Sequence, residues 1–208
     1  MSLSNLTIRR GRIEDAQDFS SLVLISAPIF FPLLFGHNVQ EVMKNLFRNH
    51  SNIFSFQHSY FIELDGRNIG MALGYTWNEG REEGFNTGML LVKYLKWDII
   101  TQAHYLLKAR EILGEIIEGD YYISNIAVYP EFRGLGLGTK LLEKMEDEAK
   151  ETDCKRMILD LETENKGAMA LYKRLGYDTE KESSTMVIRG KRFKFLRMRK
   201  IIKRGMGG

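Results

Sequence analysis

The chain of 208 residues is poor in cysteine, histidine and proline. Its one cysteine, Cys154, excludes a disulfide within the chain. The four histidines are scattered and no H-E-x-x-H motif occurs, so we expect no metal site. Positive and negative charges nearly cancel, with 30 Lys and Arg against 27 Asp and Glu, a net charge of +3. This balance argues against strong nonspecific binding of nucleic acid.

A clean hydrophobic run long enough to span a membrane is also lacking. The most apolar stretch, residues 19–36, reads FSSLVLISAPIFFPLLFG and is interrupted by serines and by Pro28 and Pro32. A spanning helix needs about 20 apolar residues, and a signal peptide would begin the chain with a basic region. We therefore expect a cytoplasmic protein without membrane contact, in which this stretch is a helix end followed by a bent, proline-containing loop.

The composition itself is that of an ordinary globular domain. Hydrophobic residues make up 44% of the chain and charged residues 27%. The length suits one domain with a sizeable core. We expect a single domain over residues 1–204 and a disordered glycine-containing tail over residues 205–208. The basic segment 189–204 is expected to be a final strand with a solvated basic face, and the alternative is a stripe that binds nucleic acid.

A glycine-rich loop carries the strongest local signal. A β-branched strand ends at Pro130, and six residues then read Arg133-Gly134-Leu135-Gly136-Leu137-Gly138, followed directly by a helical pattern. Glycines let backbone N–H groups close around an anion, and a helix N-terminus adds the positive end of its dipole. The loop is therefore expected to hold a phosphate group.

Two common nucleotide motifs do not fit this loop. A dinucleotide fingerprint would need glycine where Thr139 or Leu141 stands, and a P-loop would need the order Gly-Lys-Ser/Thr where the chain has Gly138-Thr139-Lys140. The pattern that fits is R-x-x-G-x-G. A purely geometric strand-to-helix turn remains the alternative interpretation.

A second motif follows downstream and identifies a family. Asn165 precedes Ala168-Met169-Ala170-Leu171-Tyr172-Lys173-Arg174-Leu175-Gly176-Tyr177, the pattern N…A-x-x-L-Y-x-x-x-G-[FY]. Together with R-x-x-G-x-G and the strand IAVYP at 126–130, it resembles the GNAT acyltransferase superfamily. The resemblance implies a mixed α/β (α+β) fold, in which helices flank a twisted, mostly antiparallel central sheet.

Hydrophobic periodicity predicts elements in the order of that family. Helices are predicted at residues 14–24, 40–48, 139–150 and 166–175, and strands at residues 6–10, 60–64, 69–75, 123–128, 156–161, 177–181 and 191–198. A helical insertion of about 77–119 separates the third and fourth strands. Its first part, 77–87, is polar and contains glycine, whereas 89–117 has helical spacing of apolar residues. It could line the acceptor pocket, pack on the core or form a homodimer surface.

The resemblance also implies how acetyl-CoA would bind. Its pantetheine arm would lie between two parallel strands that separate, paired with the backbone of Ile126 and Val128. The glycine loop would hold the pyrophosphate. The cofactor-binding residues so implied are Ile126, Ala127, Val128, Arg133, Gly134, Leu135, Gly136, Leu137, Gly138, Thr139, Asn165 and Tyr172.

The implied reaction is direct attack of a primary amine on the thioester, which needs a general acid and a general base. Tyr172 falls on the family position of the acid. Asp160 and Glu162 share one face of their strand and are the candidate bases. Ribosomal-protein N-terminal acetyltransferases of this superfamily have a glutamate at the position of Asp160. Glu118 and Asp120 are fallback bases that would act through water.

The expected function is thus an acetyl-CoA-dependent N-acetyltransferase that acts on a small molecule or on a protein N-terminus. A noncatalytic acyl-CoA-binding regulatory domain is the alternative. The expected partners are acetyl-CoA and an amine acceptor, without metal or nucleic acid.

Overall fold

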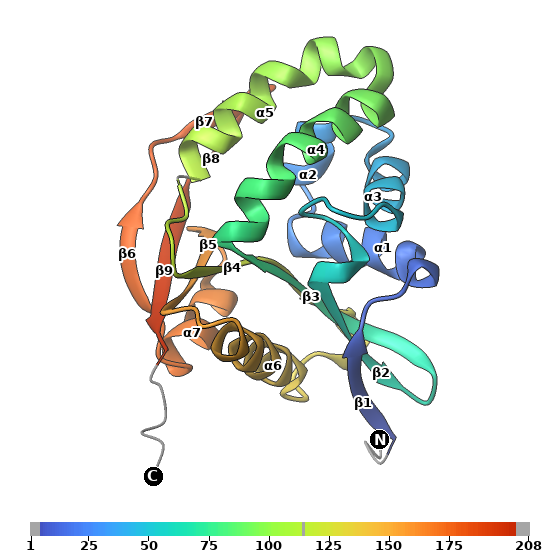
Figure 1. Ribbon diagram of the computed structural model, residues 1–208. Coiled ribbons are helices and arrows are strands. Elements are labelled where there is room, and N and C mark those ends of the chain that lie inside the picture. The colour runs from blue at the N-terminus through green and yellow to red at the C-terminus, as the bar shows by residue number, and fades with distance from the viewer. Residues whose placement is uncertain (1–4, 114, 203–208) are drawn as a thin grey trace.

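The computed structural model describes residues 5–113 and 115–202, so the predicted tail at 205–208 lies outside the described residues. Seven strands form one sheet in the order β1-β2-β3-β4-β5-β9-β6 (Figure 1). Neighbouring strands are antiparallel except β4 and β5, which are parallel. The strands are β1 (Leu6–Arg10), β2 (Ser59–Leu64), β3 (Arg67–Thr76), β4 (Asp120–Val128), β5 (Arg156–Glu162), β6 (Asp178–Glu182) and β9 (Phe195–Ile201). A separate hairpin pairs β7 (Met186–Ile188) with β8 (Lys191–Phe193).

Alternation along the strands divides the core between the two faces of the sheet. Phe61 and Met71 pack with the helices α1, α2 and α3, whereas Ile62 and Ala72 pack with α6 and α7. The helices are α1 (Ala16–Ser26), α2 (Phe30–Phe35), α3 (Val39–Arg48), α6 (Leu137–Glu151) and α7 (Lys166–Arg174). Single 3₁₀ turns occur at Ile13–Asp15, Phe56–His58, Lys96–Asp98 and Pro130–Phe132. The predicted GNAT architecture is confirmed.

The insertion between β3 and β4 is a pair of helices, α4 (Trp77–Leu95) and α5 (Ile99–Leu113), which arch over one end of the sheet (Figure 1). The sequence pattern predicted the start of the helical part at residue 89. That is too late, because the polar, glycine-containing residues 77–87 already belong to α4. A capping box begins it at Thr76. The Thr76 hydroxyl accepts from the Glu79 amide at 3.2 Å, and the Glu79 carboxylate accepts from the Thr76 amide at 2.7 Å.

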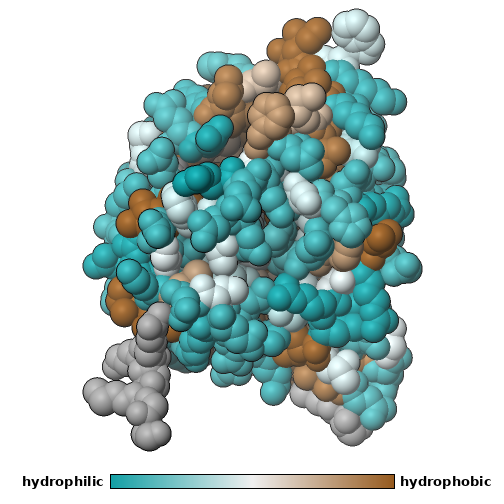
Figure 2. All heavy atoms as spheres, viewed as in Figure 1, coloured by the Kyte–Doolittle hydropathy of each residue, from teal (hydrophilic) through white to brown (hydrophobic). Residues whose placement is uncertain are grey.

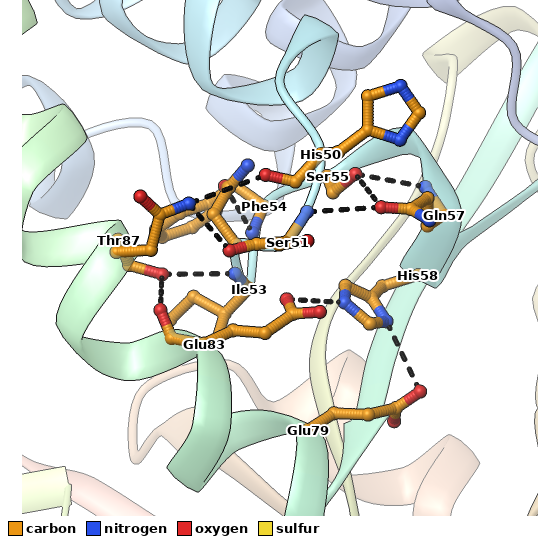
Figure 3. A network of polar contacts seen from close by, with 12 residues as sticks. His50, Ser51, Ile53, Phe54, Ser55, Gln57, His58, Glu79, Glu83 and Thr87 are labelled. Atoms are coloured by element: carbon orange, nitrogen blue, oxygen red, sulfur yellow. Dashed lines mark hydrogen bonds and ion pairs between the residues drawn. The ribbon is translucent and has the colours of Figure 1, made fainter.

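Polar contacts fix α4 to the segment that precedes β2 (Figure 3). The buried ring of His58 lies 2.8 Å from the Glu83 carboxylate through Nε2 and 3.7 Å from Glu79 through Nδ1. One turn further on, the Ile53 amide donates to the Thr87 hydroxyl at 3.1 Å. The first half of the insertion is therefore anchored to the core.

Two other predicted segments differ in the structure. The apolar stretch after α1 is not only a bent loop, since α2 forms within it with Pro32 in its first turn, where proline is tolerated. The last predicted strand is interrupted at Lys194, and its first part pairs with β7 instead. The Asp65-Gly66 turn is confirmed, with φ of 49° and 79°.

We predict that Thr76→Val lowers the free energy of unfolding by about 0.5–2 kcal/mol, because it removes a capping side chain and keeps the β-branched shape. Urea unfolding followed by circular dichroism measures this loss. Thr7→Val on the exposed face of β1 is the matched control and should change stability little. Equal losses in the two variants would contradict the capping role.

Candidate active site

The centre of the site is a gap between β4 and β5. Their parallel pairing runs from Asp120 opposite Arg156 to Ile123 opposite Leu159, and across the remainder of these two described strands no further pair forms. The register of β3 and β4 shifts at the same level, between Leu73 and Gly74. Such a bulge bends a strand. The two strands therefore part where a ligand could lie between them.

The backbone of β4 beyond Ile123 faces this gap at alternate residues. The Tyr129 amide donates to the Ile69 carbonyl at 2.9 Å and thus points toward β3. Because successive amides of a strand point in opposite directions, those of Val128 and Ile126 point toward the gap. In agreement, the Val128 carbonyl accepts from Nε of Arg133 at 3.3 Å on that side. The Ile126 and Val128 amides are therefore placed to pair with an extended ligand in the gap.

The glycine loop lies at the end of β4 and is preformed. Gly134 and Gly136 have φ of 78° and 75°, the left-handed region that favours glycine. A Cβ at either position would meet nothing within 4 Å. Within the described residues, the amides from Gly134 to Thr139 donate to no acceptor, and α6 begins at Leu137. The loop thus offers unpaired N–H groups and a helix N-terminus, a combination that fits a pyrophosphate.

A cleft of about 1130 Å³ collects most of the residues predicted from the sequence. Those that line it are Ile126, Ala127, Val128, Gly138, Asp160, Glu162, Asn165 and Tyr172. The others, Arg133, Gly134, Leu135, Gly136, Leu137 and Thr139, belong to the loop and helix start that adjoin it. The loop and the two parted strands thus open on one continuous space.

Tyr172 lies on α7 at the wall of this cleft and is only 6% exposed. Asn165 caps its helix by accepting from the Ala168 amide at 3.1 Å, as the sequence predicts. The Tyr172 hydroxyl has no hydrogen-bond partner among the described residues, and its ring packs 5.6 Å from that of Tyr177. Burial raises the pKa of Tyr172, so the hydroxyl keeps its proton at neutral pH.

Asp160 is held by a partner that the sequence did not reveal. Arg197 on β9 lies opposite it in register and donates from Nε at 3.0 Å and from a terminal nitrogen at 2.7 Å. The Tyr122 hydroxyl donates to the same carboxylate at 3.2 Å. Burial raises the pKa of Asp160, while the Arg197 hydrogen bonds oppose that rise. Arg197 itself is buried, so this part of the predicted solvated basic face is wrong.

The other carboxylates differ in their freedom to act. Glu162 makes no ion pair or side-chain hydrogen bond in the part of the chain that the structure describes, and burial, with the nearby Glu164, raises its pKa. Asp120 is occupied, because it pairs with Arg156 at 2.7 Å and accepts from the Ile117 amide at 2.9 Å. Glu118 is exposed at the edge of the cleft.

The insertion forms one wall of the cleft and also exposes apolar side chains. Gly84 and Leu91 of α4 and Leu113 of α5 line the cleft. On the outer surface, Phe85 is 80% exposed and Trp97 is 85% exposed. The hydrophobic area at the top of Figure 2 lies over this insertion. A role of the insertion in a homodimer stays a prediction.

Among the helices that the structure describes, none combines the length and apolar character needed to cross a bilayer. The described side chains include no group of three or more His, Cys, Asp or Glu placed to hold a metal ion.

The sequence model of the acetyltransferase (GNAT) family matches residues 29–177. A putative ribosomal protein bS18-alanine N-acetyltransferase of Bacillus subtilis is 38% identical over 80 residues, which are 36% of this chain and 53% of that protein. The chain thus spans about half the length of this curated relative. N-alpha-acetyltransferase 30 of Schizosaccharomyces pombe is 38% identical over 56 residues, 27% of this chain and 37% of that protein.

A solved structure of a putative acetyltransferase from Salmonella typhimurium, with its cofactor acetyl-CoA, shares the fold with a TM-score of 0.61. It is 15% identical, and the match covers 98% of each chain. The chain described here belongs to the GNAT acetyltransferase family.

We predict that Gly136→Val abolishes acetyl-CoA binding while the fold is retained, because a side chain would enter the space of the phosphate and strain the positive φ. Calorimetric titration with acetyl-CoA tests this. Gly190→Val is the matched control: Gly190 has φ of 80° and open space around it, but lies in the β7–β8 turn away from the loop. Unchanged affinity in Gly136→Val would exclude the loop as the phosphate site.

Proposed function

We propose that the chain is an acetyl-CoA-dependent N-acetyltransferase that acts on a primary amine of a small molecule or of a peptide N-terminus. One observation carries the proposal: the unpartnered hydroxyl of Tyr172 lies in the same cleft as the parted strands and the glycine loop. Amide donors, an open strand backbone and a protonated acid are the parts that acyl transfer from a thioester requires.

Acetyl-CoA would supply the acetyl group as a thioester. The amides of the glycine loop would hold its pyrophosphate, and Ile126 and Val128 would pair with its pantetheine arm. Because β4 is fixed by β3 on its other side, this pairing would set the position of the thioester relative to Tyr172. Backbone N–H groups along the gap could stabilise the oxygen charge that develops during attack.

Tyr172 would donate a proton to the sulfur that leaves. The side chain is protonated at neutral pH, the form that a proton donor needs, and the burial of its ring limits the access of competing water. Asn165 and the N-terminal turn of α7 would hold the residue in place.

Glu162 is the better placed of the two candidate bases. Its carboxylate is without a cation partner among the described residues, so its lone pairs are free to take a proton from the attacking amine. Asp160 accepts two hydrogen bonds from Arg197. It would instead contribute a negative charge near the amine and fix the Tyr122 side chain by accepting from its hydroxyl. The names of two curated relatives specify the acetylation of an alanine of a ribosomal protein and N-alpha acetylation. They support an amine acceptor for this chain as well.

We predict that Tyr172→Phe lowers kcat by about 10²-fold, the low end of general acid catalysis, because a thiolate is already a fair leaving group. Acetyl-CoA affinity should change little, since the hydroxyl acts only as the C–S bond breaks. Thiol release from acetyl-CoA across a panel of amines and peptides measures kcat. Tyr177→Phe is the control, because Tyr177 is a buried neighbour on which the proposed reaction does not depend. A wild-type kcat in Tyr172→Phe would remove Tyr172 from the mechanism.

We also predict that kcat/KM falls as pH drops through the raised pKa of Glu162, because the base must be ionised to accept the amine proton. Glu162→Gln should remove this acid limb and lower the rate at neutral pH. Asp160→Asn should keep the limb. If Asp160 is the base instead, Asp160→Asn should remove the limb and Glu162→Gln should leave it in place.

A further inference from the structure

The cleft extends beyond the parted strands into a space between β3 and the two insertion helices. One face of α4 forms its wall, with residues at helical spacing: Trp77, Gly80, Arg81, Gly84, Thr87, Gly88 and Leu91. Across from it stand residues of α5, namely Leu106, Ala109, Arg110 and Leu113. Aromatic side chains from α2 and from the loop before β2 close the apolar side, among them Phe31, Phe35 and Phe54.

Beside Arg81 and Thr87, which also line the cleft, two glycines leave open positions on the α4 wall. A Cβ at Gly84 or at Gly88 would meet nothing within 4 Å, so no packing in the described structure requires glycine there. Glycine inside a helix costs about 1 kcal/mol relative to alanine. Neither position has a positive φ that would favour glycine. The two glycines are therefore not explained by the fold, and they widen the cleft.

A tyrosine hydroxyl without a protein partner among the described residues opens on the cleft where this face meets the reaction centre. Tyr75 on β3 lines the cleft and is 8% exposed, yet its hydroxyl has no hydrogen-bond partner among the described residues. Its ring lies 5.6 Å from that of Tyr122, which donates to Asp160. A Cβ on Gly80 would come within 2.9 Å of the Tyr75 ring. The hydroxyl opens on the cleft, so it is available to donate to an acceptor of a bound ligand.

The length of the glycine-containing face of α4 fits a short extended peptide better than a compact amine. From Gly80 to Gly88 the helix rises about 12 Å at 1.5 Å per residue. An extended peptide covers about 3.3–3.6 Å per residue, so three to four residues would span this face. A side chain on the helix would block that path, whereas glycine leaves it open.

We propose that Tyr75 and the glycine face of α4 form the acceptor subsite, and that its occupant is the amino-terminal segment of a peptide with apolar residues after the first. The Tyr75 hydroxyl donates to the first peptide carbonyl, and the terminal amine lies in the part of the cleft that Asp160 and Glu162 line. The following residues run along Gly84 and Gly88, with their side chains against the aromatic wall. This assignment rests on the proposed function, because it takes the terminal amine as the group that is acetylated.

Direct binding tests the subsite without turnover. In calorimetry with CoA present, the probes are the tetrapeptide amide Ala-Leu-Phe-Leu and, for comparison, alanine amide. We expect the wild-type protein to bind the tetrapeptide at least ten-fold more tightly than alanine amide. Gly84→Leu should remove that advantage and Tyr75→Phe should weaken tetrapeptide binding about five-fold, the value of one hydrogen bond.

Glu82→Leu is the matched control, because Glu82 is exposed on the same helix and does not line the cleft. It should keep the tetrapeptide affinity. Thermal unfolding should show Gly84→Leu at least as stable as the wild type, since leucine is a better helix former than glycine and meets open space.

Two results would overturn the subsite: tetrapeptide binding no tighter than that of alanine amide, or equal tetrapeptide affinity in Gly84→Leu and Glu82→Leu. Failure of the proposed function is recognised separately. It would appear as an absence of thiol release from acetyl-CoA with every amine, whatever the binding data show.

Discussion

The parting of β4 from β5 is the constraint on which the rest of the site depends. A sheet gains stability from a continuous backbone ladder, and here the ladder stops in the middle of the sheet at Ile123 and Leu159. Each strand stays ordered because its other neighbour holds it, β3 on one side and β9 on the other. The unpaired backbone between them thus has a fixed position. The glycine loop and Tyr172 then lie at defined places around a rigid opening.

The Asp160–Arg197 pair connects this opening to the insertion. Both side chains are about 95% buried, and Arg197 also donates to the carbonyls of Leu113, the last residue of α5, and of Glu115 beyond it. One guanidinium therefore joins β5, β9 and the end of the insertion. Loss of one member of a buried pair leaves an uncompensated charge and costs about 3–5 kcal/mol. The second half of the insertion is fixed here, as the first half is fixed at His58 and Glu83.

Local signals predicted the glycine loop, the Asn165 cap and the turn at Gly66, because each depends on residues within one short segment. The start of α4 was missed although its Thr76-x-x-Glu79 capping box is also local, since the glycines that follow argued for a loop. The role of Arg197 could not be predicted. Its partner lies 37 residues away, and only the pairing of β5 with β9 brings the two together.

The insertion also has a consequence for how the chain folds. β3 and β4 are adjacent antiparallel strands, with Thr76 opposite Tyr121, so all of α4 and α5 lies within the loop that their pairing must close. Compared with a turn of a few residues, a loop of this length adds about 2 kcal/mol of closure entropy. Contacts between distant residues form slowly. The strand that borders the ligand gap is therefore expected to pair late, after the insertion helices have formed and shortened the distance between its ends.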